Sequence, residues 1–355
     1  MKLLFIGWGE HMHVIRWMEQ FALRGEKISV LNLSERVKYR FPVRQFRNPF
    51  VKQRLSVQQL WVRLVIALVR PRIIHVHWLH FLALVPASWK GPIVVTGWGS
   101  DLYQPHDLSP AQREALTHNI QRVDWFTVDS ADQREVLMEQ WNVPGDKVEV
   151  VQWGVDLETF SPGPPVEQRE HIIYSCRAIT PIYNQDVIMR AFAKVREKIS
   201  DARLIIKKFR ATDPPLSQVL ALIEELHLQD SVEVLDSLPY EALPKLYQSA
   251  MVSVSIPTTD GTPMAVLETM SCGALPVFTD LPSLREWIVD GENGYLSDPK
   301  DVDMLADKLL QAFELDDQRK REITQNNLRL VRETADQKMH MNRVHDRYKA
   351  LAARD

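Results

Sequence analysis

Cysteine is scarce in this sequence, with only Cys176 and Cys272 among 355 residues. Two cysteines cannot build a disulfide framework, and neither has a partner at Cys-x-x-Cys or metal-ligand spacing. Such sparse usage is typical of proteins from a reducing compartment. We therefore expect a cytoplasmic protein whose two thiols are buried and unreactive.

Long apolar runs are also missing. The longest, residues 60–69, is interrupted by Arg63 and covers about half of the roughly 20 residues that a membrane-spanning helix needs. Residues 2–6 are too short for the apolar core of a secretory signal peptide, and two glycines follow at once. We expect neither a membrane span nor a leader, whereas association with a membrane surface is a separate question.

Acidic residues are absent from one long segment. Between residues 36 and 100 there is no Asp or Glu, although the whole chain has a net charge of −3. The same segment contains eleven basic residues, namely Arg36, Lys38, Arg40, Arg44, Arg47, Lys52, Arg54, Arg63, Arg70, Arg72 and Lys90. A positive patch on a slightly acidic protein predicts an anionic partner or an acidic region elsewhere.

The rest of the composition is ordinary for a globular protein, at 45% hydrophobic and 25% charged residues. That balance excludes a disordered or fibrous chain and gives no indication of a nucleic-acid partner. A length of 355 residues predicts two domains, each large enough to bury its own core.

Short apolar strands alternate with helical patterns along the chain. In the first half we predict strands at residues 2–6, 27–31, 73–77, 93–96 and 125–129. After the proline-rich residues 161–165 the pattern restarts, with strands predicted at residues 172–175, 203–206, 232–235, 252–255 and 275–278. This alternation predicts an α/β fold of two Rossmann-like, doubly wound parallel sheets facing a cleft, with ligands at the carboxyl ends of the strands.

The proline-rich stretch is the predicted domain boundary. We place the first domain at residues 1–162 and the second at residues 163–315. Residues 316–355 are polar with sparse apolar positions, so we predict one or two long helices that pack back on the first domain.

One helix predicted within the basic segment has two apolar stripes. The predicted core face consists of Val57, Leu60, Trp61, Leu64, Val65 and Leu68, which recur at helical spacing. The second stripe, predicted to be accessible to lipid headgroups, consists of Val62, Ile66 and Val69. The basic segment as a whole has two interpretations, electrostatic docking on an anionic membrane surface or an ordinary solvated face.

Residues 256–273 are the most informative part of the chain, because an apolar strand ends there and a helix begins. Thr262 is suited to the N-cap and Pro263 to the first helical position. The N–H groups of Met264 and Ala265 then point out of the helix start, which is a natural site for phosphate oxygens.

Glu268 lies in an otherwise apolar run of the same helix. Helical side chains lean towards the N-terminus, so its carboxylate is predicted to accept hydrogen bonds from hydroxyl groups such as those of a ribose. The alternative is a solvated surface charge. An acid among apolar residues is more often paired or directed at a ligand.

Asp260 and Glu268 enclose seven residues, and the string around them resembles the E-x7-E region of the family 4 retaining glycosyltransferases, which have the GT-B fold. Further pieces resemble that family in the same order along nearly the whole chain, namely Gly9 with His13, residues 96–101, Gly154-Val155-Asp156, Arg177 and residues 286–294. Their shared order and spacing carry the resemblance.

The resemblance implies transfer of a sugar from a UDP- or GDP-linked donor to a glycan, a lipid-linked molecule or a small-molecule acceptor. By this resemblance Glu268 binds the donor's ribose, Asp260 lies beside the sugar, and Leu238 contacts the base. The remaining implied donor contacts are Gly9, Gly261, Thr262, Met264 and Ala265.

A basic pair that neutralises the diphosphate is also implied. Arg177 matches its first member, but Tyr183 stands where the family usually has a lysine. We expect Lys207 or Lys208 to supply the second charge, the alternative being that both are surface lysines. Asp101 matches the active-site loop of the first domain, so it is either a catalytic contact with sugar or acceptor or a cap of the following turn.

Two departures concern the first domain. Trp98 stands where relatives often carry a histidine beside the sugar. Several histidines lie near strand ends, namely His11, His13, His75, His77 and His80. No carboxylate or cysteine accompanies them, so packing or hydroxyl contacts are expected in place of a zinc site.

We identify no metal-binding acidic motif, and fixed side-chain cations make a metal unnecessary for stabilising the leaving diphosphate. No metal and no cofactor besides the nucleotide-sugar co-substrate are therefore expected. The resemblance implies retention of anomeric configuration without a protein nucleophile. Two alternatives are a donor-binding protein without transferase activity and a sugar-nucleotide 2-epimerase of the same fold. The string from Asp260 to Glu268 argues against the epimerase.

Overall fold

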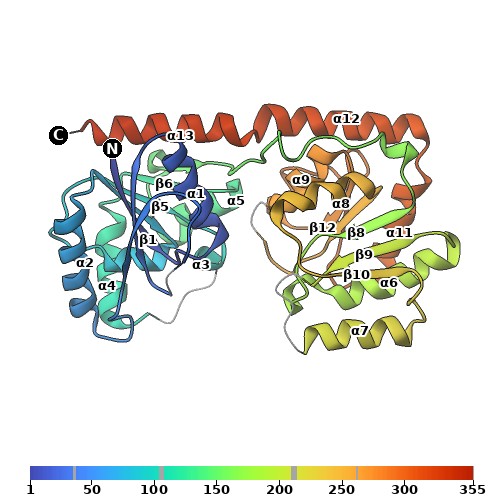
Figure 1. Ribbon diagram of the computed structural model, residues 1–355, viewed down its shortest axis with the longest axis horizontal. Helices are drawn as coiled ribbons and strands as arrows, with labels where there is room; N and C mark the ends of the chain where they lie inside the picture. Colours follow the sequence, from blue (N-terminus) through green and yellow to red (C-terminus); the bar gives the residue numbers. More distant parts are fainter. Residues whose placement is uncertain (35–36, 104–107, 209–213, 261–262, 355) are drawn as a thin grey trace. The chain divides into compact units, whose positions relative to one another are not determined.

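The computed structural model describes the chain except for residues 35–36, 104–107, 209–213, 261–262 and 355. It forms two compact units, Met1–Gln152 together with Met339–Asp355, and Trp153–Lys338 (Figure 1). The predicted boundary after residue 162 lies further along the chain, since residues 153–162 belong to the second unit. Within the described residues, no helix is both long and apolar enough to cross a bilayer.

A seven-stranded parallel sheet forms the centre of the first unit. Its strands are β1 (Lys2–Gly7), β2 (Lys27–Asn32), β3 (Val43–Arg47), β4 (Ile73–His77), β5 (Ile93–Thr96), β6 (Trp125–Val128) and β7 (Val148–Val150). They are arranged in the order β3-β2-β1-β4-β5-β6-β7. The winding direction therefore changes between β1 and β4, which is the place where such sheets bind ligands at their carboxyl ends.

Helices cover both faces of this sheet. They are α1 (Met12–Leu23), α2 (Leu55–Val69), α3 (Ser100–Tyr103), α4 (Pro110–Ile120), α5 (Ala131–Gln140), most of α13 (Gln337–Ala352) and the short 3-10 helices η1 (Leu79–Leu84) and η2 (Gly145–Lys147). Ser130 is the N-cap of α5, where its side chain accepts a hydrogen bond from the Gln133 N–H at 3.2 Å.

The second unit contains a six-stranded parallel sheet in the order β10-β9-β8-β11-β12-β13. Its strands are β8 (Ile172–Ser175), β9 (Arg203–Lys207), β10 (Val232–Leu235), β11 (Val252–Ser255), β12 (Leu275–Thr279) and β13 (Tyr295–Ser297). Its α-helices are α6 (Gln185–Lys198), α7 (Pro215–Glu225), α8 (Leu243–Ser249), α9 (Met264–Cys272), α10 (Pro282–Arg285), α11 (Val302–Glu314) and α12 (Asp317–Thr334). Its 3-10 helices are η3 (Val166–Gln168), η4 (Pro181–Tyr183) and η5 (Tyr240–Ala242). Here the winding direction changes between β8 and β11.

The two cysteines lie within the second unit, and both are buried as predicted. Burial raises the pKa of Cys176 to about 11 and that of Cys272 to about 12. Since the thiolate is the reactive form, neither thiol is a nucleophile near neutral pH.

The predicted helix in the basic segment is present as α2, but the assignment of its faces was wrong. Of the predicted core face Val65 is buried, but Leu60 and Leu64 are 57% and 50% exposed. Val62 and Val69, which were predicted to be accessible to lipid, are buried against the sheet. Both stripes recur at helical spacing, so periodicity alone cannot choose between them. The compact valines pack on the sheet, and the longer leucines lie outside.

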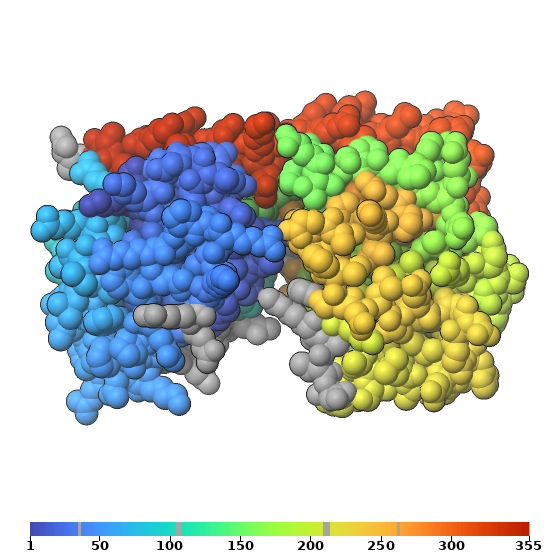
Figure 2. Space-filling view, in the orientation of Figure 1, coloured from blue at the N-terminus to red at the C-terminus, as the bar shows by residue number. Residues whose placement is uncertain are grey.

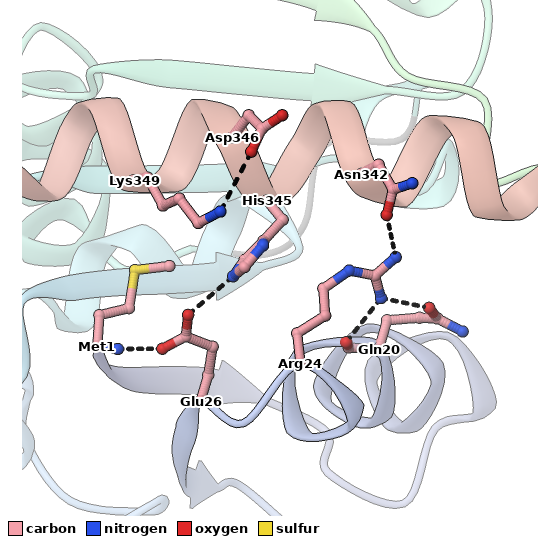
Figure 3. Close-up of polar contacts among 8 residues, drawn as sticks. All are labelled: Met1, Gln20, Arg24, Glu26, Asn342, His345, Asp346 and Lys349. Carbon is pink, nitrogen blue, oxygen red and sulfur yellow. Dashed lines mark hydrogen bonds and ion pairs between the residues drawn. The ribbon is translucent and has the colours of Figure 1, made fainter.

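The last helix closes one face of the first unit. Met341, Val344, Tyr348 and Leu351 of α13 are buried. Figure 3 shows the polar contacts that flank them: His345 Nε2 lies 2.8 Å from Glu26 Oε1, and Arg24 Nη2 donates to Asn342 Oδ1 at 2.8 Å. Glu26 also pairs with the amino group of Met1.

A buried hydrogen-bonded chain joins α13 to the strands. The Tyr348 hydroxyl lies 2.7 Å from His75 Nδ1, and His75 Nε2 lies 2.7 Å from the Thr96 hydroxyl, which in turn contacts Thr127 at 2.6 Å. Neutral imidazole offers one donor and one acceptor, so it completes this chain without a charge. Burial lowers the pKa of His75 to about 3.

We predict that His75 makes the first unit sensitive to acid. Its ring must be neutral in the folded state but binds a proton below about pH 6.5 in the unfolded chain. The free energy of unfolding should therefore fall as the pH drops from about 6.5 to about 3, by up to about 1.4 kcal/mol per pH unit from this group. Urea unfolding at a series of pH values should show a shallower decline for His75→Gln. The exposed His118→Gln control should follow the wild type, and a His75→Gln slope equal to the wild type contradicts the prediction.

Candidate functional site

Three charged side chains meet at the switch point of the second sheet. Arg177 follows β8, Asp260 follows β11, and Lys207 is the last residue of β9. Because parallel strands present their carboxyl ends at one edge, these residues come together although they are far apart in sequence. Asn184 ties the loops after β8 and β11 to each other, since its side-chain Nδ2 donates to the Ile256 carbonyl at 2.7 Å.

The Arg177 guanidinium is held from two sides. Its Nη2 lies 2.8 Å from Asp260 Oδ2 and donates to the Tyr183 hydroxyl at 2.7 Å. The guanidinium carbon Cζ also lies 4.5 Å from the centre of the Tyr183 ring. Burial opposes the charge, but attraction to Asp260 and Tyr183 more than offsets it, so the pKa of Arg177 lies above its ordinary value. Arg177 is therefore a permanent, oriented cation with further N–H donors available for another acceptor.

The structure distinguishes the two lysines that follow Ile206. Lys207 is only 5% exposed, and its Nζ donates to the Tyr174 hydroxyl at 2.8 Å and to the Cys176 carbonyl at 3.3 Å. Lys208 lies on the other side of the chain, where its Nζ pairs with Asp236 at 3.0 Å on an exposed surface. Successive side chains of a strand point to opposite faces, so only one of the two can face the site.

The environment of Lys207 is unusual for an ammonium group. Burial lowers its pKa, Cys176 and Glu268 partly oppose that effect, and the nearby Arg177 adds to it. A buried lysine kept beside an arginine favours any anion that neutralises both.

Glu268 lies in the interior of the same unit, with an exposure of 5%. The Tyr247 hydroxyl donates to its Oε2 at 2.8 Å, and the Tyr240 hydroxyl donates to its Oε1 at 3.2 Å. The alternative of a solvated charge is therefore wrong. Glu268 is a buried acceptor that binds hydroxyl groups.

Three tyrosines of this environment were missed at the level of sequence, namely Tyr174, Tyr240 and Tyr247. Burial, with a further contribution from Glu268, raises the pKa of Tyr247 well above its ordinary value, so it stays a hydrogen-bond donor. Tyr174 lies within an apolar strand, but Tyr240 and Tyr247 lie beside polar residues such as Glu241 and Lys245. No local pattern indicates which charged group each tyrosine contacts.

The start of α9 is one residue later than predicted. Pro263 is the N-cap, with extended backbone angles, and Met264 is the first helical residue. Pro263 was expected inside the helix, and the predicted N-cap Thr262 and its neighbour Gly261 lie outside the described residues. Met264 is partly exposed and Ala265 is buried, and both are in the first turn, where N–H groups lack helical acceptors. Leu238 lies in the loop that follows β10 and is partly buried.

Gly9 belongs to the first unit, in the loop after β1. Its N–H donates to Asn32 Oδ1 at 3.0 Å, and its carbonyl accepts from the Tyr39 hydroxyl at 2.9 Å. A Cβ at this position would lie 2.5 Å from that hydroxyl oxygen, so a larger residue would displace the Tyr39 side chain from its contact with the loop. Burial raises the pKa of Tyr39 to about 12, with a smaller contribution from Glu10.

Asp101 is only 1% exposed, and its carboxylate is engaged by the backbone. Its Oδ1 accepts from the Trp98 N–H at 2.9 Å and its Oδ2 from the Leu79 N–H at 2.6 Å. This geometry gives Asp101 a positioning role, because it fixes the loops after β4 and β5. Its contact with a sugar or acceptor stays a prediction.

The histidines of the first unit lie among aromatic rings. His77 is fully buried, and the Trp98 indole N–H donates to its Nδ1 at 3.2 Å while the rings stack at 5.8 Å. His13 also stacks on Trp98, with the ring centres 4.3 Å apart. Burial, with repulsion from neighbouring histidines, lowers the pKa of His77 well below its ordinary value. These contacts fit the packing interpretation.

The acidic groups of the described residues do not converge on a metal position. Within the part of the chain that the structure describes, no group of three or more His, Cys, Asp or Glu side chains has metal-binding geometry. Asp301 and Asp303 have the spacing of an acidic metal motif that our sequence reasoning passed over. Asp301 instead caps α11 by accepting from the Met304 N–H at 2.9 Å, and Asp303 pairs with Lys194.

Comparison with known families accounts for almost the whole chain. The model described as Glycosyltransferase Family 4 matches residues 9–159, and the model described as Glycosyl transferases group 1 matches residues 158–329. The chain belongs to the family 4 glycosyltransferases. The matched regions divide close to the boundary between the two structural units.

Curated relatives of this family are distant. A D-inositol 3-phosphate glycosyltransferase of Frankia alni is 28% identical over 194 residues, covering 51% of this chain and 48% of that protein. An O-antigen chain mannosyltransferase B of Escherichia coli is 24% identical over 224 residues, covering 60% and 58%. The chain spans about half the length of the curated relatives it matches.

Solved structures resemble the chain over its whole length. HepE of Anabaena in complex with UDP has a TM-score of 0.81 at 15% identity and covers 99% of this chain and 100% of that one. Sucrose-phosphate synthase of Thermosynechococcus elongatus has a TM-score of 0.81 at 16% identity, with 99% of both chains covered. At such identities the likeness shows the fold, which is GT-B, as predicted.

We predict that Tyr247 stabilises the Glu268 carboxylate. Tyr247→Phe leaves a buried charged acceptor without one donor, which should lower the free energy of unfolding by about 1.5–3 kcal/mol. Tyr240→Phe is the matched control, and it should cost less because its bond is longer and its ring is partly exposed. Urea unfolding of both variants measures the difference. A Tyr240→Phe loss as large as that of Tyr247→Phe contradicts the assignment.

Proposed function

We propose that the protein is a retaining glycosyltransferase that moves a sugar from a UDP- or GDP-linked donor to an acceptor. The observation that supports this most directly is the pair of cations at the switch point of the second sheet. Arg177 follows β8, Lys207 ends the neighbouring β9, and α9 begins after β11, which lies on the other side of β8. This is a suitable arrangement for a diphosphate.

The proposed roles follow from these contacts. Arg177 and Lys207 bind the diphosphate, with the N–H groups of Met264 and Ala265 as additional donors. Asp260 orients Arg177 through its ion pair, and its proposed second role is a contact with the sugar attached to the phosphates. Glu268 accepts hydrogen bonds from the ribose, and Leu238 packs against the base. Lys208 has no role in the site because it faces solvent with Asp236.

Catalysis in this proposal is electrostatic. The bond between the anomeric carbon and the diphosphate oxygen breaks, the acceptor oxygen bonds to the same face of that carbon, and the acceptor's proton passes to the leaving phosphate. Negative charge therefore accumulates on the diphosphate in the transition state, where fixed cations stabilise it most. No protein nucleophile and no metal take part.

The basic segment suggests where the acceptor is found. We propose that it associates with an anionic membrane surface at the inner face, because its side chains include many exposed cations and no acids between residues 36 and 100. An acceptor carried on a lipid would then be presented to the enzyme at that surface.

A donor-binding protein without turnover is the competing function. Tyr183, which stands at the usual lysine position, favours it, whereas the inward-facing Lys207 supports an enzyme by restoring the missing charge. Incubation with labelled UDP- and GDP-hexoses separates the two, since an enzyme hydrolyses its donor slowly even without an acceptor and a binding protein does not.

We predict that Lys207 is the second catalytic cation. Lys207→Met should lower kcat more than it raises KM, because the contact strengthens in the transition state. The matched Lys208→Met variant should resemble the wild type. Steady-state kinetics with a donor that the wild type hydrolyses gives kcat and KM for both variants.

The alkaline side of the pH profile gives a second readout of Lys207. Because burial lowers the pKa of its ammonium group, activity should decline at a lower pH than an exposed lysine would produce. Lys207→Arg should move that decline to higher pH. If Lys208→Met loses activity and Lys207→Met does not, the assignment is wrong.

We predict that Glu268→Ala weakens nucleotide binding by about 1.5–3 kcal/mol, because a charged acceptor is lost. The exposed Glu241→Ala variant makes the same change of charge near the site and should bind normally. Calorimetric titration with UDP and with GDP gives both affinities. Equal affinities for the two variants would remove Glu268 from the site.

We predict that turnover survives chelation, since the proposed cations are side chains. Donor hydrolysis in EDTA should equal that of the untreated protein. Loss of activity that magnesium or manganese restores would overturn the metal-independent mechanism.

A further inference from the structure

An apolar stripe runs along the solvent side of α2. It consists of Val57, Leu60, Leu64 and Leu68, which are 37%, 57%, 50% and 59% exposed. At a rise of 1.5 Å per residue these four side chains extend over about 17 Å on one face of the helix. In Figures 1 and 2, α2 lies at the left margin of the first unit, outside its sheet. We call these four residues the leucine stripe.

The leucine stripe is flanked by cations. Lys52 and Arg54 precede the helix, Arg63 lies on it, and Arg70 follows it, all of them exposed. Among the described residues, none of the four has a carboxylate partner, and α2 itself contains no acidic residue. These charges are therefore available to an anionic partner instead of being used within the fold.

A groove adjoins the stripe on the side of Arg63. It has a volume of about 860 Å³ and lies between the start of α2 and α4. Its lining includes the charged residues Lys52, Arg54, Arg63 and Glu114. Three permanent cations against one carboxylate make it suitable for an anionic headgroup next to the apolar surface.

The combination distinguishes between possible occupants. A second copy of this chain would bring the same basic flanks together, and one row of four side chains is narrow beside the roughly 800 Å² per partner of a stable protein interface. An anionic bilayer surface suits both groups of side chains, because its phosphates can contact the cations and the acyl chains just below them can contact the leucines.

We propose that α2 is a membrane-docking helix whose leucine stripe enters the headgroup layer of an anionic bilayer while Lys52, Arg54, Arg63 and Arg70 contact lipid phosphates. The inference rests on the proposed membrane association and specifies its surface. It also reverses the face expected from the sequence, since Val62 and Val69 are in the core.

A fluorescent probe tests which face enters the bilayer. Both native cysteines are buried, so Leu64→Cys introduces a single reactive thiol for a polarity-sensitive dye. Addition of phosphatidylcholine–phosphatidylglycerol vesicles should shift its emission to the blue, and vesicles of phosphatidylcholine alone should not. The matched control is Leu220→Cys, an exposed leucine of α7 in the second unit, whose emission should stay unchanged.

Vesicle flotation tests the contribution of the stripe to binding. The triple variant Leu60→Gln, Leu64→Gln, Leu68→Gln should bind anionic vesicles at least about tenfold more weakly than the wild type. The control triple variant Leu23→Gln, Leu220→Gln, Val289→Gln removes equally exposed apolar groups elsewhere and should bind normally. Arg63→Glu should also weaken binding, and added salt should reduce what remains.

The other outcomes overturn the inference in distinguishable ways. Suppose that the wild type and the α2 triple variant bind anionic vesicles equally and that the dye at position 64 shows no blue shift. The association is then driven by charge, and insertion of the leucine stripe is excluded. Absence of any binding refutes the membrane association as well. A wild-type dimer that becomes a monomer in the α2 triple variant, with no vesicle binding, assigns the stripe to a second copy. Donor hydrolysis is measured separately, so none of these results bears on the enzymatic proposal.

Discussion

The ion pair between Arg177 and Asp260 is the interaction on which the proposed site depends. It joins the loops after β8 and β11, the two strands between which the second sheet changes its winding direction. Arg177 keeps its charge against the cost of burial because Asp260 and Tyr183 are in contact with it. Around this pair the unit buries a second cation, Lys207, and a carboxylate, Glu268, each satisfied by tyrosine hydroxyls. Burying so many charges lowers the stability of the fold. Binding of an anionic ligand is a functional reason to keep them.

The candidate site residues of the two units have different roles. In the first unit, Gly9 and Asp101 shape the loops at the carboxyl ends of the strands by hydrogen bonds to neighbouring groups. In the second, the charged side chains themselves face the site. The proposed enzyme thus has a first unit with an outer helix suited to a membrane surface, and a second unit whose electrostatics suits a diphosphate.

Much of this could be predicted from the sequence, because strand patterns and the Asp260–Glu268 string are local signals. Strands such as β4, β8 and β11 have the predicted bounds, whereas β3, β7 and β13 were missed because they are short or only partly apolar. The choice between Lys207 and Lys208 depends on which face of the sheet each side chain points to, and the partners of Glu268 come from η5 and α8. Neither can be predicted from a local pattern. The faces of α2 were reversed for the same reason: two stripes with equal periodicity differ only in how they pack on the sheet.

The most direct test of the central claim is hydrogen–deuterium exchange with saturating UDP or GDP. The account predicts slower exchange at three places in the second unit, namely the loop that contains Arg177 and Tyr183, the end of β9 at Lys207, and the start of α9 at Met264 and Ala265. Lys208→Met should give the same pattern as the wild type. Protection confined to other segments, or none with either nucleotide at a concentration that saturates binding, would contradict the claim that these groups hold the donor's diphosphate.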